Sequence, residues 1–97
     1  MLTITNHAYD RRKRTGLNKK AFERLAEKAL ELGVKHSETS GRFRRLFTSL
    51  YFKEKCANNI RVYGDFIWLF ANETLITVLH LNNSFKKYVW HTKNYML

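Results

Sequence analysis

Two apolar segments joined by a very short connection constrain the fold more than any other feature of this sequence. Residues 66–70 and 74–81 are rich in β-branched, aromatic and leucine side chains, and only Ala, Asn and Glu lie between them. A connection of three residues is too short for a crossover, so the pair predicts a β-hairpin of central strands. Residues 60–63, followed by Gly64 and Asp65 as a turn, predict a further strand.

The first third of the chain has the spacing of helices instead. Asn18 is a favourable N-cap, and Gly33 ends the pattern that follows it. A shorter helix is predicted for residues 7–15, with Gly16 at its end. The longer helix has one apolar stripe, with residues three or four apart: Phe22, Leu25, Ala26, Ala29 and Leu32.

Two other segments are interpreted as β-forming. Residues 43–52 are rich in aromatic and β-favouring side chains, and residues 85–90 follow a polar turn and predict an edge strand. The expected fold class is therefore α+β, with two N-terminal helices followed by an antiparallel sheet of about four strands. We expect the second helix to cover the apolar face of the sheet. Residues 1–97 are expected to form a single basic domain.

The charge balance is the main indication of a partner. The chain has 18 Lys and Arg against 8 Asp and Glu, a formal net charge of +10. Self-repulsion opposes compaction, so an excess of this size favours a phosphate-bearing partner over a merely solvated surface, which stays the alternative. The predicted contacts with nucleic acid come from two basic blocks: Arg12, Arg14, Lys19, Lys20, Arg42, Arg44 and Arg45. Aromatic side chains would add base stacking, or else core packing: Tyr51, Tyr63, Trp68, Tyr88 and Trp90.

The first predicted helix has almost no apolar residues and one unusual stripe. At about 100° per residue, His7, Arg11 and Arg14 lie on the same side. A histidine between guanidinium groups suits proton transfer beside a bound phosphate, although solvated side chains would give the same pattern. Thr77 is the other candidate, as a hydroxyl donor in a predicted central strand, and its alternative is an ordinary strand-forming threonine.

Several classes of protein are disfavoured. Cys56 is the only cysteine, no HExxH or glycine-rich phosphate loop occurs, and the carboxylates are scattered, so we expect no metal and no cofactor. The longest apolar run has six residues, against the roughly 20 of a membrane span. No membrane association is expected, and the absence of a signal-peptide pattern favours a cytoplasmic protein.

Three short motifs resemble a known group of proteins. They are Ile-Thr-Asn-His-Ala-x-x-Arg at residues 4–11, with Gly16 after it, the run at residues 59–65, and Leu-Ile-Thr-Val-Leu at residues 75–79. A further segment, Lys-His-Ser-Glu-Thr at residues 35–39, is similar to hypothetical proteins of Firmicutes and their mobile elements. Together the three motifs resemble small uncharacterised Firmicutes and phage proteins grouped with the barnase, EndoU, colicin and RelE-like ribonuclease superfamily. The resemblance implies metal-independent, toxin-like RNA cleavage by attack of the 2′-hydroxyl. It implies His7 as general acid or base, Arg11 as the phosphate ligand and Thr77 as a donor to the same group.

A non-enzymatic function stays open beside the ribonuclease hypothesis. A nucleic-acid-binding protein explains the charge and the aromatic content without any chemistry. A phage or mobile-element inhibitor that engages a host nucleoprotein through its basic face explains them too. The expected partner is RNA or another nucleic acid, with an antitoxin-like or host-defence protein as a further alternative.

Overall fold

The computed structural model describes the backbone of residues 2–96 and the side chains of residues 2–89. Within these residues a five-stranded sheet has the order β1-β5-β4-β3-β2. Its centre is an antiparallel meander of β3 (Asn59–Tyr63), β4 (Phe66–Ala71) and β5 (Thr74–His80). Two short edge strands complete it: β1 (Thr3–Ile4) runs parallel to β5, and β2 (Val34–Lys35) runs antiparallel to β3.

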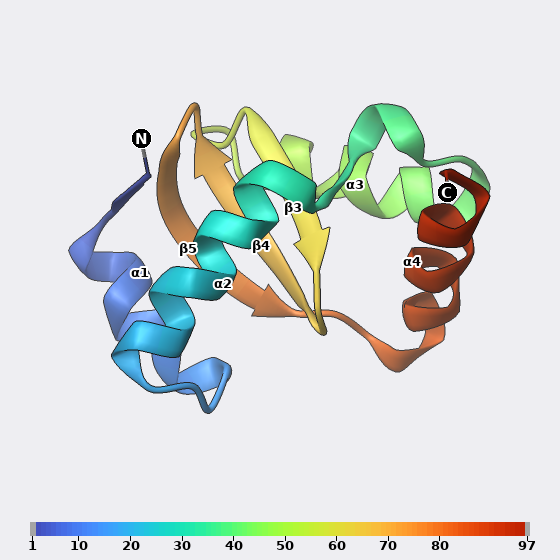
Figure 1. The fold of residues 1–97 in the computed structure, drawn as a ribbon. Coiled ribbons are helices and arrows are strands. Elements are labelled where there is room, and N and C mark those ends of the chain that lie inside the picture. The colour runs from blue at the N-terminus through green and yellow to red at the C-terminus, as the bar shows by residue number, and fades with distance from the viewer. Residues whose placement is uncertain (1, 97) are drawn as a thin grey trace.

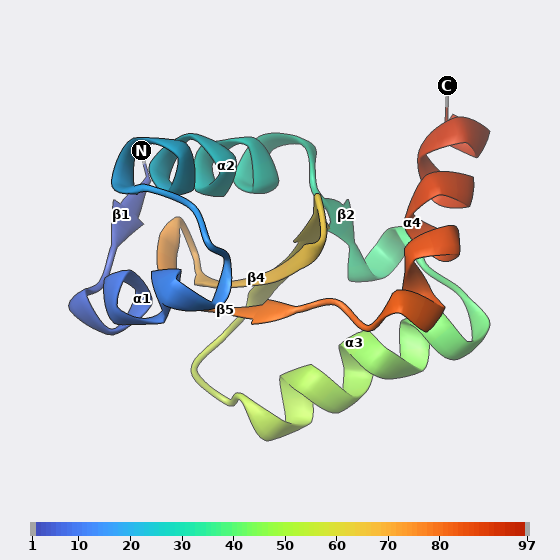
Figure 2. The same ribbon diagram turned by 90° about the horizontal axis from the view of Figure 1, so that it is seen from below.

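Helices cover both faces of this sheet (Figure 2). Helix α2 (Lys19–Leu32) packs on one face and α3 (Gly41–Lys53) on the other. Helix α1 (Asn6–Arg11) continues into a 3₁₀ turn, η1 (Arg12–Arg14), beside β5 at the sheet edge (Figure 1). Helix α4 (Asn83–Met96) packs near the start of α3, and a second 3₁₀ turn, η2 (His36–Glu38), precedes α3.

The two faces bury two separate clusters of side chains. On the α2 side, Phe22, Ala26 and Ala29 pack on residues of β4 and β5, including the fully buried Trp68. On the α3 side, Phe43 and Phe47 pack on Ile60, Val62 and Leu69. A sheet that is buried on both faces explains why β4 is apolar along its whole length.

Local signals explain the start of each N-terminal helix. The Thr5 hydroxyl accepts a hydrogen bond from the Ala8 N–H at 3.1 Å and donates to the Ile76 carbonyl at 3.3 Å. Asn18 caps α2 by accepting from the Ala21 N–H at 2.8 Å, as predicted. Thr5 therefore caps α1 and also ties it to β5, and the wholly buried Ala8 adds a packing contact.

The α+β class is confirmed, but the predicted arrangement was wrong in four respects. Residues 43–52 belong to helix α3, and residues 85–90 belong to helix α4, not to strands. The sheet has five strands, and the pairing of β1 with β5 is parallel. In both helices the apolar residues recur every three or four positions, and this helical period determines which face is buried. The prediction of strands rested on the aromatic content of these segments, which is typical of strands.

The helices show no membrane-crossing segment among the described residues. None of them combines the length and the hydropathy that a bilayer-spanning helix requires.

Candidate nucleic-acid interface

Helix α3 presents a polar, basic face to solvent on the side opposite the sheet. Phe43 and Phe47 are four residues apart and point into the core. At about 100° per residue, Arg45, Ser49 and Phe52 fall within about 60° of one another on the opposite side. Because Phe43 and Phe47 hold the helix on the sheet, these three residues on the opposite side are exposed to solvent. We call the residues that line this side the α3 face, and they are Gly41, Arg44, Arg45, Thr48, Ser49 and Phe52.

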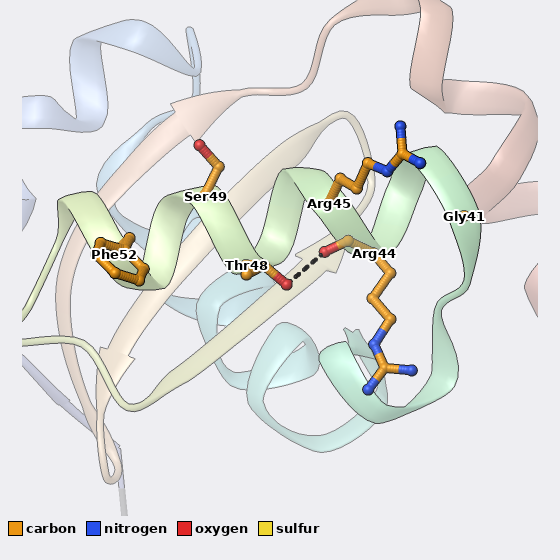
Figure 3. Close-up of a pocket in the computed structure, with 6 residues that line it drawn as sticks. All are labelled: Gly41, Arg44, Arg45, Thr48, Ser49 and Phe52. Atoms are coloured by element: carbon orange, nitrogen blue, oxygen red, sulfur yellow. Dashed lines mark hydrogen bonds between the residues drawn. The ribbon is translucent and has the colours of Figure 1, made fainter.

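The α3 face is a shallow, open hollow and not a closed cavity. It has a volume of about 570 Å³. In Figure 3 the side chains of Arg44 and Arg45 leave the helix on opposite sides, and Phe52 lies about two turns further along. Such an open surface fits an extended polymer better than a small molecule enclosed on all sides.

The charge of α3 is not compensated within the helix. Residues 41–53 contain four cationic residues and no acidic residue. Among the residues whose side chains are described, neither guanidinium group of Arg44 or Arg45 forms a hydrogen bond or an ion pair. The five N–H donors of each arginine therefore point to solvent and are available to an anion.

One hydroxyl on the α3 face is already held in place. Thr48 Oγ1 donates to the Arg44 carbonyl at 3.0 Å and lies 3.0 Å from Nε2 of His36. The His36 ring also stacks on Phe47, with centroids 6.0 Å apart. Thr48 is thus part of a fixed network, whereas Ser49 forms no side-chain hydrogen bond in the described region.

Three of the four predicted nucleic-acid contacts in the first basic block are bound to the protein itself. Arg12 Nη1 donates to the Leu17 carbonyl at 2.7 Å, and Arg14 Nη1 donates to the Val78 carbonyl at 3.2 Å. The Lys19 ammonium lies 5.4 Å from the centre of the Tyr9 ring. These side chains hold the loop and η1 against the fold, so they have fewer donors left for a ligand.

Of the other predicted contacts, Arg42 is also engaged. Its guanidinium lies 5.0 Å from the centre of the Phe85 ring on α4. Lys20 is exposed on the first turn of α2, on the other side of the sheet from α3. Arg44 and Arg45 are therefore the predicted cations that the fold brings together with free guanidinium groups.

The three predicted catalytic residues do not form one site through direct contacts. His7 and Arg11 are both exposed on α1, one turn apart. Thr77 is buried and lies opposite Leu69 in the register of β4 and β5. Leu69 belongs to the cluster under α3, so Thr77 faces that side, whereas α1 packs through Ala8 on the other cluster.

A bulge explains this orientation of Thr77. The register shifts between Leu69 and Phe70, so that Leu69 pairs with Thr77 and Phe70 pairs with Leu75. Ile76 is the extra residue, and it packs toward the α3 side as Thr77 does. No hydrogen bond links Thr77 to His7 or Arg11 among the described side chains. The catalytic roles of the three residues stay predictions.

The predicted stacking aromatics are largely part of the core. Trp68 is fully buried and donates from Nε1 to the Tyr63 carbonyl at 3.1 Å. Tyr88 stacks on Phe43, and Tyr51 contacts His36. The side chain of Trp90 lies outside the described residues. Packing in the core, which was the alternative to base stacking, therefore accounts for the four rings whose side chains are described: Tyr51, Tyr63, Trp68 and Tyr88.

Sequence reasoning missed Thr48, Ser49 and Phe52. All three lie in the segment interpreted as β-forming, and a strand would have divided them between two faces. A helical projection of residues 41–53 would have placed them on the same side as Arg45. Ser49 follows Arg45 by four residues and Phe52 follows it by seven, which are helical intervals.

Two further findings bear on function. In the described part of the chain, no three His, Cys, Asp or Glu side chains gather as a metal site. The chain matches no protein-family model, no curated protein and no solved structure. The resemblance to the ribonuclease superfamily therefore stays a prediction.

Proposed function

We propose that this protein binds nucleic acid and that the α3 face is its phosphate-contacting surface. The observation that supports this most directly is the pair Arg44 and Arg45, adjacent on one helix, exposed and without an anionic partner among residues 2–89. Each guanidinium can hold a phosphate with two parallel hydrogen bonds. No described group accepts from these donors, so their capacity is left for a ligand.

The arrangement favours a polyanion over a single small anion. The two guanidinium groups diverge from α3, so they suit phosphates at separate positions along a backbone (Figure 3). The net charge of +10 attracts a polyanion at long range and increases its rate of association. Release of counterions from the phosphates then supplies much of the binding free energy.

The proposal is tested by measuring the affinity for a fluorescently labelled 20-nucleotide RNA by anisotropy. The double variant Arg44→Ala/Arg45→Ala should bind at least about tenfold more weakly than wild type, because two phosphate contacts are lost. Arg24→Ala/Lys28→Ala is a matched control, since both residues are exposed on α2 and the same charge is removed. Equal weakening by both double variants would show a general charge effect and contradict a site on α3.

We propose RNA cleavage at His7 as a second candidate function, supported by one local observation. His7 and Arg11 are exposed one turn apart on α1, whose first turn is fixed to β5 through Thr5. In this reaction the 2′-oxygen bonds to phosphorus and the bond to the 5′-oxygen breaks. A base takes the 2′-hydroxyl proton and an acid protonates the leaving oxygen, and His7 would serve one of these roles. Arg11 would stabilise the charge on the phosphate.

Incubation of RNA with the protein in EDTA tests this second candidate. Wild type should release fragments ending in a cyclic phosphate, and His7→Ala should release none while keeping its affinity for RNA. His80→Ala is the control, since His80 is an exposed histidine at the end of β5 whose ring contacts Phe66. Intact RNA after incubation with wild type would overturn the cleavage proposal and leave nucleic-acid binding standing.

A further inference from the structure

Phe52 is the most exposed large apolar side chain among the described residues. It is 81% exposed, whereas the other phenylalanines of α3, Phe43 and Phe47, are each 1% exposed. Leaving a phenylalanine in water forgoes the free energy that burial of its ring would release. Nothing in the fold requires an aromatic ring at this position, because Leu46, Leu50 and Tyr51 complete the contacts of α3 with the sheet.

The position of Phe52 connects it to the cationic part of the α3 face. It lies one turn from Ser49 and about 10 Å along the helix axis from Arg45, on the same side of α3. Lys53 and Lys55 follow it in the chain, and both are exposed. An exposed ring therefore shares one open surface with the guanidinium groups of Arg44 and Arg45 and with the Ser49 hydroxyl.

We propose that the α3 face binds single-stranded nucleic acid, with an unpaired base stacked on Phe52 and the adjoining backbone phosphate held by Arg45. This inference rests on the proposed function and specifies its ligand. Every base has a π-face, so a ring in a basic groove binds single strands with little dependence on sequence. In a duplex those faces are covered by neighbouring base pairs, and only base edges are accessible in the grooves.

The experiment compares three labelled ligands of one sequence: a 20-nucleotide RNA, the same strand as DNA, and its DNA duplex. Phe52→Ala should weaken binding of the single strands by between about 5-fold and 150-fold, the range for loss of one stacked base. Binding of the duplex should change less than about twofold. Because Phe52 carries no charge, the dependence of affinity on salt should keep the wild-type slope.

Two further variants make the result specific to stacking. Phe52→Trp should bind single strands at least as tightly as wild type, because the larger ring also stacks, and its added fluorescence should be quenched by RNA. Leu32→Ala removes another exposed apolar side chain, 50% exposed on α2, and should leave the affinity unchanged. Circular dichroism of Phe52→Ala should match wild type, since the ring is outside both clusters.

The outcomes separate this inference from the proposal on which it rests. Wild-type affinity of Phe52→Ala for both single strands, or an equal loss for single strands and duplex, would overturn stacking on Phe52 and leave phosphate binding by Arg44 and Arg45 intact. Absence of binding to all three ligands by wild type would overturn both. A loss confined to RNA, or to DNA, would support stacking and identify which of the two is the ligand.

Discussion

The hydroxyl oxygen of Tyr51 accepts a hydrogen bond from the backbone N–H of Ile60 at 2.8 Å. Ile60 is fully buried on β3, and strand β2 pairs only with the two residues that follow it, Arg61 and Val62. The Tyr51 hydroxyl thus accepts from a backbone N–H of β3 that lies beyond the end of β2 and has no partner in that strand. The same hydrogen bond fixes the last turn of α3 to the sheet. Its neighbour, Phe52, is directed about 100° away from this contact, into solvent.

Tyr51→Phe should destabilise the protein by about 1–3 kcal/mol, because the buried N–H of Ile60 loses its acceptor. For a domain of this size, each kcal/mol corresponds to a decrease in Tm of about 4–8 °C, measured by thermal unfolding. Tyr63→Phe is the control, since the Tyr63 hydroxyl forms no described hydrogen bond, and it should stay within about 0.5 kcal/mol of wild type. Equal stability of the two variants would contradict the anchoring role of Tyr51.

Gly33→Ala should destabilise the protein by about 1–3 kcal/mol through steric overlap. A Cβ at this position would lie 2.5 Å from the Ala29 carbonyl oxygen and 2.8 Å from Cβ of Arg61. The backbone dihedrals of Gly33, φ −62° and ψ 151°, are available to alanine, so the cost comes from the contacts and not from the conformation.

Urea unfolding measures this difference, with Lys35→Ala as an exposed control nearby that should change stability by less than about 0.5 kcal/mol. A Gly33→Ala variant as stable as wild type would show that α2 and β3 are not in close contact here.

Tyr9 should make stability dependent on alkaline pH. Partial burial and then the negative charge of Glu23 raise the pKa of Tyr9 above its ordinary value near 10. The folded state therefore holds this proton more tightly than the unfolded state. The resulting stabilisation is fully present below the ordinary pKa and is lost as the pH rises through the raised pKa of the folded state.

The check is the free energy of unfolding, measured from pH 9 upward for wild type and Tyr9→Phe. Comparison with Tyr9→Phe isolates Tyr9 from the lysines that titrate in the same range, and wild type should lose stability relative to the variant as the pH rises. Parallel curves over this range would show that the pKa of Tyr9 is the same in the folded and unfolded states.

The parts of the fold that depend on local signals were predictable from the sequence. The cap at Asn18 and the stripe from Phe22 onward define α2, and the short connection after Ala71 defines the hairpin of β4 and β5. The edge strands β1 and β2 have only two residues each, too few to show a period. Their pairing is determined by tertiary contacts, such as the parallel pairing of Thr3 with Thr74.

The candidate site was predictable only in its charge. The excess of cations indicated a polyanion, but residue type does not show which cations the fold itself uses. Arg14 is bound to the carbonyl of Val78, 64 residues away, whereas Arg45 is bound to none of the described groups. The exposure of Phe52 depends on the helical state of residues 41–53. The aromatic composition of this segment favoured a strand instead, so the exposure was not predicted.

The most direct test of the account is the salt dependence of binding to single-stranded RNA. The logarithm of the affinity should decrease linearly with the logarithm of the salt concentration, with a slope of about 0.7 for each phosphate contact. Arg44→Ala/Arg45→Ala should have a slope smaller by about 1.4 than that of wild type, and Arg24→Ala/Lys28→Ala should keep the wild-type slope. Identical slopes for wild type and the Arg44→Ala/Arg45→Ala variant would contradict the claim that the α3 face binds phosphate.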